Sequence, residues 1–450
     1  MSFSTDFLPS LCEEFKKNAS IAPEAYEQYN VKRGLRNADG SGVVAGLTRV
    51  CNVHGYVISE GEKTPVEGRL TYRGQNIENL VNACAEENRF GYEEVVWLLL
   101  FGTLPTAQQL EGLRTLLSEY RELPDYFAED MIIKAPSPNI MNKLGRSVLA
   151  LYSYDDNPDD LSLSNVLDQS LRLIARMPTI MTYAYQVKRR HYDHQSMFFH
   201  PLPEGLSTAE CILHSLRPDT VYTEAEAHLL DLCLMLHAEH GGGNNSAFAA
   251  RVLSSSGTDT YAAISAAIGS LKGPRHGGAN IKVTEMIDYI AEGVRDWNDD
   301  DEIAAFLKKL IRREAGDRSG LIYGMGHAVY TLSDPRAVML KRYARGLAEE
   351  KGLGGRFRLT EAVERLTPHV FAEEKGSTKA MCANVDLYSG LVYQSLGISQ
   401  DLFTPLFAVA RTAGWCAHRV EELYTGGRII RPAYKSLARE SVYVPIAARG

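Results

Sequence analysis

One histidine lies between two glycine-containing turns and is the first residue whose setting could support chemistry. His276 occupies the motif GPRHGGAN, between an apolar helical pattern over residues 259–271 and a second one over residues 281–290. Because it lies close to the N-terminus of the second helix, free N–H groups and a positive partial charge there disfavour a protonated imidazole. A neutral imidazole can donate a hydrogen bond to a developing oxyanion. The alternative interpretation is a histidine that only caps a helix in a tight loop.

Two further motifs supply a second histidine and an aspartate. His327 lies in GMGHAVY and Asp386 lies in NVDLYSG. We expect Gly324 and Gly326 to let the backbone approach a ligand closely. Taken alone, His327 could equally be a buried histidine bonded to the backbone, and Asp386 a helix cap or a turn residue. Together, two imidazoles and a carboxylate are groups that can carry acid–base catalysis.

In their order along the chain, these motifs resemble those of the citrate synthase family. The resemblance covers the chain from about residue 42 to residue 432. It implies an enzyme that condenses acetyl-CoA with oxaloacetate and hydrolyses citryl-CoA to citrate and CoA, with no cofactor and with the CoA thioester as substrate. Asp386 would remove the methyl proton, His276 would donate to the thioester oxygen, and His327 would polarise the oxaloacetate carbonyl and act as an acid.

The resemblance also implies a dicarboxylate site that is built from arginines. Arg336 and Arg411 match arginines that bind oxaloacetate, and Arg431 matches one that the neighbouring subunit contributes. Guanidinium groups hold carboxylates through two parallel hydrogen bonds, which suits this substrate. Any one of these arginines, taken alone, could be a solvated surface residue. Because Arg431 would act across an interface, the resemblance predicts a homodimer.

A loop with a histidine and an asparagine would hold oxaloacetate as well. His240 and Asn244 match the family's loop, with Gly241 in place of its glutamate. The sequence predicts one helix over residues 224–240, which would place His237 and His240 on one face, so a metal site is an alternative interpretation. No third ligand with recognisable spacing follows and HExxH is absent, so we expect no metal.

The sequence does not identify the residues that would bind the phosphates of CoA. Some relatives carry basic residues after the GHAV motif, where this chain has Thr331 and Leu332. The sequence selects none of the possible substitutes, which are Arg73, Arg146 and Lys272.

Length and composition set the broad class of the protein. With 450 residues, the chain can form one large domain and a smaller one. Its net charge of −8 and the lack of a basic tail disfavour nucleic acid as a partner. Seven scattered cysteines without a CxxC pair predict reduced thiols in a cytoplasmic protein. The N-terminus lacks the pattern of a signal or transit peptide, and the longest apolar run, residues 95–101, is too short to span a membrane.

Helical patterns dominate the chain from about residue 92, and these elements must position the motifs. Residues 43–50, 56–58 and 68–74 are typical of short strands. Because no β-α alternation or repeat occurs, we expect a mainly α protein with a two-domain helical fold and a small N-terminal β element. Three capping boxes open apolar helical runs: Thr106 with Gln109, Ser207 with Glu210, and Thr223 with Glu226.

By resemblance, residues 1–276 and 390–450 form a large domain and residues 277–389 a small one, with the active site in the cleft between them. Two alternatives to a citrate synthase stay open. A 2-methylcitrate synthase would use propionyl-CoA, and one extra methyl group in an apolar pocket is worth only about 1–3 kcal/mol, so sequence alone does not decide. The other alternative is a non-catalytic helical scaffold or metal-binding protein.

Overall fold

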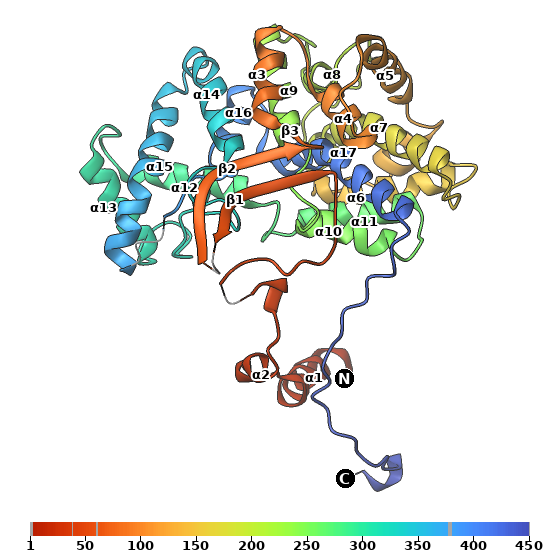
Figure 1. Cartoon of the computed structure of the whole chain (residues 1–450), viewed down its shortest axis with the longest axis vertical. Coiled ribbons are helices and arrows are strands. Elements are labelled where there is room, and N and C mark those ends of the chain that lie inside the picture. The colour runs from red at the N-terminus through yellow and green to blue at the C-terminus, as the bar shows by residue number, and fades with distance from the viewer. Residues whose placement is uncertain (1–2, 38, 60–61, 377–379, 450) are drawn as a thin grey trace.

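The structure is a computed structural model that describes residues 3–37, 39–59, 62–376 and 380–449. A helical body carries a small sheet on one side, and the segments at both chain ends extend away from that body (Figure 1). The expected class, mainly α with a small N-terminal β element, is confirmed. Within the described residues, no helix combines the length and apolar character that crossing a membrane requires.

Seventeen α-helices occur in the described part of the chain. The first nine are α1 (Phe3–Ala19), α2 (Pro23–Gln28), α3 (Ile77–Glu86), α4 (Tyr92–Phe101), α5 (Ala107–Tyr120), α6 (Ile140–Ala150), α7 (Leu163–His191), α8 (Thr208–Leu216) and α9 (Glu224–His237). The others are α10 (Asn245–Ser254), α11 (Thr260–Lys272), α12 (Ala279–Gly293), α13 (Asp300–Ile311), α14 (Pro335–Glu350), α15 (Gly354–Lys375), α16 (Asp386–Ser395) and α17 (Phe403–Tyr424).

The sheet is antiparallel, with strand order β1-β2-β3. Strands β1 (Cys51–Ser59) and β2 (Glu62–Tyr72) form a long pair, and β3 (Gln75–Asn76) adds a short edge. The strand expected over residues 43–50 is wrong, because this segment pairs with no strand of the described structure, and Val44 and Leu47 are 84% and 91% exposed. Its local pattern fits a strand, but a strand also needs a neighbour to pair its backbone groups.

The three predicted capping boxes are present. At the start of α5, Thr106 Oγ1 accepts a bond from the backbone N–H of Gln109 (3.2 Å), and Gln109 Oε1 accepts one from the N–H of Thr106 (2.9 Å). The same reciprocal pairs open α8 and α9. Each box satisfies two N–H groups that a helix start leaves free, so these boundaries follow from local sequence.

Helix α17 lies in the middle of the large group of helices and contacts α4, α7, α9, α10 and α11. Helices α12, α14 and α15 pack on α16, and α13 packs on α15 (Figure 1). Helix α16 also contacts α9, where the rings of His237 and Tyr393 lie 6.4 Å apart, so α16 lies where the two groups of helices meet. The exact domain division at residues 277 and 389 stays a prediction.

Helix α9 ends at His237, so the predicted end at His240 is wrong. The hydroxyl of Tyr72, from β2, lies 3.0 Å from the carbonyl oxygen of Met235, and Arg411 Nε, from α17, donates to the carbonyl of His237 (2.6 Å). These side chains satisfy carbonyl groups at the helix end, which the chain can then leave without an energetic penalty. As a result, His237 and His240 do not share a helix face.

Candidate active site

Two of the predicted motifs are tied together by hydrogen bonds. The backbone N–H of Asn384 donates to the carbonyl of Gly324 (2.8 Å), and its side-chain Nδ2 donates to the carbonyl of Gly326 (2.9 Å). His327 directly follows the first segment, and Asp386 ends the second, at the start of α16. The pairing therefore fixes the backbones that carry the two side chains.

The structure gives different reasons for glycine at the two positions of the GMGHAVY motif. Both take a left-handed φ, 80° at Gly324 and 86° at Gly326. A Cβ at Gly324 would come within 2.9 Å of Leu387, so packing against α16 explains that glycine. At Gly326 the nearest atom to such a Cβ is 3.9 Å away, and the expected close approach of a ligand stays a prediction there.

His327 is held in one neutral tautomer. Its Nδ1 accepts hydrogen bonds from the backbone N–H groups of Val329 and Tyr330, both at 3.1 Å. Burial lowers the pKa of His327 to about 4, and the positive charge of Arg336 acts in the same direction. A neutral ring with an accepting Nδ1 carries its proton on Nε2. His327 therefore offers Nε2–H as a donor.

His276 lies in the loop between α11 and α12 and is neutral as well. Burial lowers its pKa to about 4, and Arg411 contributes in the same direction. This agrees with the predicted neutral form, although burial rather than the helix end is the main cause. Its Nε2 lies 3.0 Å from Ser246 Oγ.

Ser246 links His276 to Asn244. Asn244 caps α10, because its Oδ1 accepts the backbone N–H of Ser246 (3.2 Å), and Ser246 Oγ lies 2.8 Å from the same oxygen. Trp415 Nε1 donates to Ser246 Oγ (3.1 Å). The hydroxyl has a single proton, with which it can donate a hydrogen bond either to Asn244 or to His276. When it goes to His276 Nε2, the imidazole proton lies on Nδ1.

Asp386 is the first residue of α16 and is largely buried. Burial raises the pKa of its carboxyl from 3.8 to about 6, against the opposing charges of Arg336 and Arg411. The group is therefore a stronger base than an ordinary aspartate and is still mostly ionised at pH 7.

Arg411 is a buried cation whose guanidinium is only partly bonded. Its Nε donates to the carbonyl of His237, whereas Nη1 and Nη2 have no hydrogen-bond partner in the described structure. The guanidinium lies 4.6 Å above the ring of Phe407. A buried charge without partners is costly, and two free guanidinium nitrogens match the two oxygens of a carboxylate. This geometry fits an anion site.

Arg336 is fixed by a buried internal ion pair. Its Nε and Nη2 donate to the two oxygens of Asp334, at 3.0 and 2.7 Å. Asp334 also caps α14 by accepting the backbone N–H of Arg336 (3.0 Å). The pair orients the guanidinium and leaves Nη1 outside it, so Arg336 can still contact a second anion.

His240 lies beside His327. Their rings meet edge to face with centroids 5.1 Å apart, and His240 Nε2 lies 3.3 Å from the hydroxyl of Tyr330. Burial, followed by the charge of Arg336, lowers the pKa of His240 well below its ordinary value. His240 is therefore a neutral group in the same cluster.

Arg431 is the one predicted site residue that the single chain does not bring into this cluster. It is exposed and lies in the extended segment that follows α17 (Figure 1). Its expected role at the site of a partner subunit stays a prediction.

His237 and His240 are the two residues at which the sequence raised a metal site as an alternative. His237 Nδ1 lies 2.7 Å from the carbonyl of Cys233, and its ring packs edge-on against Phe407. Among the described residues, no group of three or more histidine, cysteine, aspartate or glutamate side chains is arranged to hold a metal ion. The absence of a metal from the reaction stays a prediction.

Two of the three cations that could bind the phosphates of CoA donate hydrogen bonds to backbone carbonyl groups of the protein. Arg73 Nη2 donates to the carbonyl of Leu99 (2.8 Å), and Arg146 Nη2 donates to that of Ala135 (3.3 Å). Lys272 ends α11. The residues that would contact the CoA phosphates remain unassigned.

A chain of buried polar groups behind the site was missed by the sequence analysis. His418 Nε2 lies 2.9 Å from Glu239 Oε1, and Arg251 Nη2 lies 2.7 Å from His418 Nδ1. Glu239 also accepts the N–H of Gly241 (2.5 Å), and its charge opposes the lowering of the Arg411 pKa by burial. These residues are far apart in the sequence, and the only local signal was a histidine inside the apolar helix α17.

Comparisons with known proteins agree with this geometry. A family model described as "Citrate synthase, C-terminal domain" matches residues 38–433. A citrate synthase of Acidithiobacillus ferridurans is 35% identical over 420 residues, covering 91% of this chain and 97% of that protein. A 2-methylcitrate synthase of Shewanella oneidensis is 34% identical over 391 residues, covering 84% and 92%.

A solved structure extends the similarity to the fold. It is the citrate synthase of the thermophilic archaeon Thermoplasma acidophilum in a ternary complex with carboxymethyl coenzyme A and oxaloacetate. It superimposes with a TM-score of 0.74 at 25% identity, covering 93% of this chain and 99% of that one.

Proposed function

The chain belongs to the citrate synthase family, and from this premise we propose that it condenses acetyl-CoA with oxaloacetate and hydrolyses the citryl-CoA formed to citrate and CoA. One observation carries the proposal. The buried guanidinium of Arg411 has two nitrogens without a hydrogen-bond partner among the described residues, and its charge acts on both a neutral His276 and the carboxyl of Asp386. A carboxylate substrate would satisfy that cation and lie beside an acid–base pair.

Asp386 would begin the reaction as the base. Its carboxylate takes a proton from the methyl group of the acetyl thioester, and the C–H electron pair forms the carbon–carbon double bond of an enolate. A pKa of about 6 makes this carboxylate more basic than an ordinary aspartate while keeping it ionised at neutral pH.

His276 would stabilise the enolate by donating a hydrogen bond to the thioester oxygen. This requires the ring proton to lie on Nδ1. That is the tautomer present when the hydroxyl of Ser246 donates a hydrogen bond to Nε2, 3.0 Å away. Its low pKa keeps the ring neutral, so the imidazole donates this hydrogen bond as an uncharged group.

His327 would act on the second substrate. Its Nε2–H donates to the keto oxygen of oxaloacetate, which makes the keto carbon more electrophilic. The enolate carbon attacks that carbon and a carbon–carbon bond forms as the C=O electron pair moves onto the keto oxygen. The new alkoxide then takes the proton from Nε2 of His327, which acts as the acid. Arg411 and Arg336 would hold the two carboxylates, and water then cleaves the citryl thioester to release CoA.

We further propose that the active form is a homodimer in which Arg431 contacts oxaloacetate in the site of the partner subunit. In support, Arg431 lies exposed in a segment that leaves the body of its own chain (Figure 1). We also propose a cytoplasmic location, because all seven cysteines are free thiols in the described structure, which suits a reducing compartment.

The second candidate function is 2-methylcitrate synthesis from propionyl-CoA, which the Shewanella relative supports by its name. The test is the release of free thiol from acetyl-CoA and from propionyl-CoA, each with and without oxaloacetate. We expect oxaloacetate-dependent release with a higher kcat/KM for acetyl-CoA. A higher kcat/KM for propionyl-CoA would favour the second candidate, and no release from folded protein with either donor would contradict both.

A further inference from the structure

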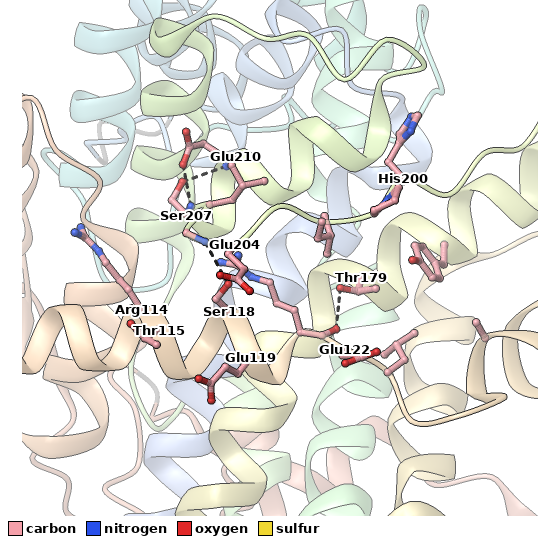
Figure 2. A pocket seen from close by; sticks show the side chains of 18 of the residues that line it. Arg114, Thr115, Ser118, Glu119, Glu122, Thr179, His200, Glu204, Ser207 and Glu210 are labelled. Atoms are coloured by element: carbon pink, nitrogen blue, oxygen red, sulfur yellow. Dashed lines mark hydrogen bonds between the residues drawn. The ribbon is translucent and has the colours of Figure 1, made fainter.

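A cavity of about 1070 Å³ lies between α5, the segment that follows α5, helix α7 and the segment that leads into α8 (Figure 2). None of its lining residues belongs to the candidate active site. The volume lies just above the range of about 300–1,000 Å³ that is typical of small-molecule sites. The question is which ligand its side chains would recognise.

The first buried group without a partner in this cavity is a cation. Arg121, at the end of α5, is 4% exposed, and its Nη1 has no hydrogen-bond partner in the described structure. Within the described residues, no carboxylate lies within ion-pair distance of its guanidinium. Burying an uncompensated charge is costly, and the planar guanidinium is suited to a carboxylate. Arg121 therefore calls for an anionic group.

The second buried group has the opposite charge. Glu93 is 1% exposed, and its Oε1 accepts bonds from the backbone N–H and the hydroxyl of Thr208, both at 2.8 Å. Its Oε2 is buried without a partner in the described residues. A group with N–H donors would satisfy this oxygen. One ligand that carries both an anion and an ammonium group would supply partners for Glu93 and Arg121 together.

The rest of the lining is strongly acidic. Eight carboxylates and two arginines line the cavity. Glu119, Glu122 and Glu204 are exposed and lie around the hollow in Figure 2. Such a negative field disfavours polyanions such as nucleotides and attracts a ligand whose net charge is positive. The carboxylate that Arg121 needs must therefore belong to a molecule with more than one cationic group.

We propose that this cavity binds a basic α-amino acid, with its carboxylate on Arg121, its α-ammonium group at Oε2 of Glu93 and its side-chain cation facing the acidic rim. The rim is defined by Glu119, Glu122 and Glu204. This site shares no residue with the candidate active site.

Isothermal titration of the full-length protein with three matched probes tests the proposal. L-lysine carries all three groups, norleucine lacks the side-chain cation, and 1,5-diaminopentane lacks the carboxylate. We expect saturable binding of lysine, or of arginine as a second probe, and at least about tenfold weaker binding of the other two. Absence of saturation by lysine and arginine up to about 10 mM would overturn the proposal. Equal affinity for the diamine would also overturn it, since only a negatively charged surface would then be involved.

Variants assign the contacts. Arg121→Gln should weaken lysine binding at least about tenfold and leave diamine binding unchanged. The matched control is Arg295→Gln, a 96% exposed arginine outside the cavity, which should change neither. Thermal unfolding and thiol release check that each variant is folded.

Should Arg121→Gln fail to fold, the combined variant Glu119→Gln, Glu122→Gln and Glu204→Gln tests the same site at exposed positions. It should weaken lysine binding and leave norleucine binding unchanged. Lysine binding that survives in both the Arg121 and the rim variants would contradict the assignment of the cavity.

Discussion

Burial shifts the pKa values of three side chains in the candidate active site. Each shift favours the protonation state that the proposed reaction needs. Burial lowers the pKa of His276 and His327 to about 4, so both are neutral donors. Burial raises the pKa of Asp386 to about 6, which increases its basicity. In the proposed reaction, the same burial would prepare two donors and one base, because a low dielectric penalises the charged form of each group.

These values predict a simple pH profile. The base must be ionised, so kcat/KM for the acyl-CoA should fall about tenfold per pH unit below about pH 6, as Asp386 becomes protonated. The two histidines remain neutral throughout that range, so no further limb should arise from them between about pH 5 and pH 8. The measurement is kcat/KM from about pH 4.5 to pH 8. A flat profile through about pH 5 would contradict the role of Asp386.

Arg411 carries the prediction on substrate binding. Arg411→Gln removes a buried charge whose Nη1 and Nη2 have no partner in the part of the chain that the structure describes, and we expect oxaloacetate to bind at least about thirtyfold more weakly. Calorimetric titration with oxaloacetate measures the change. Arg365→Gln, at an exposed ion pair with Asp300, is the matched control and should leave the affinity unchanged. Unchanged affinity in Arg411→Gln would show that the carboxylate binds elsewhere.

At this scale, the sequence motifs identify the side chains but not what holds them. His276, His327 and Asp386 are visible in their glycine-marked motifs. The link from Glu239 to His418 joins positions far apart in the chain, so no local pattern could predict it. The burial that shifts the three pKa values also depends on helices that are distant in sequence.

At the scale of elements, the loop that carries His240 and Asn244 depends on how α9 ends. Tyr72, from β2, lies against the carbonyl of Met235 at that end. Tyr72→Phe leaves buried carbonyl groups less well satisfied, and we expect it to lower the free energy of unfolding by about 1–3 kcal/mol. It should also weaken oxaloacetate binding, because the loop loses its support.

Thermal unfolding and oxaloacetate titration check both effects. Tyr126→Phe is the control, because Tyr126 is 75% exposed and distant from α9 in sequence. If Tyr72→Phe changed neither stability nor affinity, another contact would have to end the helix.

The elements that could be predicted are those with local causes. The capping boxes at Thr106, Ser207 and Thr223 placed three helix starts correctly, because each box satisfies its own N–H groups. The strand over residues 43–50 and the end of α9 were wrong, because each depends on a partner elsewhere in the chain: a missing strand neighbour in one case and Tyr72 in the other.

For the whole molecule, the exposed end segments bear on the proposed dimer. The segment after α17 runs away from the helical body (Figure 1). It carries Arg431 and several exposed apolar side chains, among them Tyr434, Val442 and Tyr443. Apolar residues gathered on an extended segment favour contact with another surface. The fold class could be predicted from helical patterns, whereas the proposed contact of this segment with a second subunit follows from the family resemblance alone and stays a prediction.

Hybrid dimers test whether the site is shared. Arg431→Gln and Asp386→Asn should each be almost inactive alone. A mixed dimer would contain one complete site, in which an intact Asp386 meets the Arg431 of the Asp386→Asn chain. Equal mixing with subunit exchange should restore about a quarter of the wild-type activity. Arg428→Gln, in the same exposed segment, is the control and should remain active alone. No restoration after proven exchange would contradict a shared site.

The central claim is that Asp386 removes the proton that starts the condensation, and Asp386→Asn tests it most directly. Oxaloacetate-dependent thiol release from acetyl-CoA should fall about 10²–10⁴-fold, while the Kd for oxaloacetate stays within about threefold. The folded pKa of Asp386 lies above its unfolded value, so its ionisation opposes folding above pH 6 and the variant should unfold at an equal or higher temperature at pH 7.5. Near-wild-type turnover, or loss of oxaloacetate binding together with turnover, would contradict the claim.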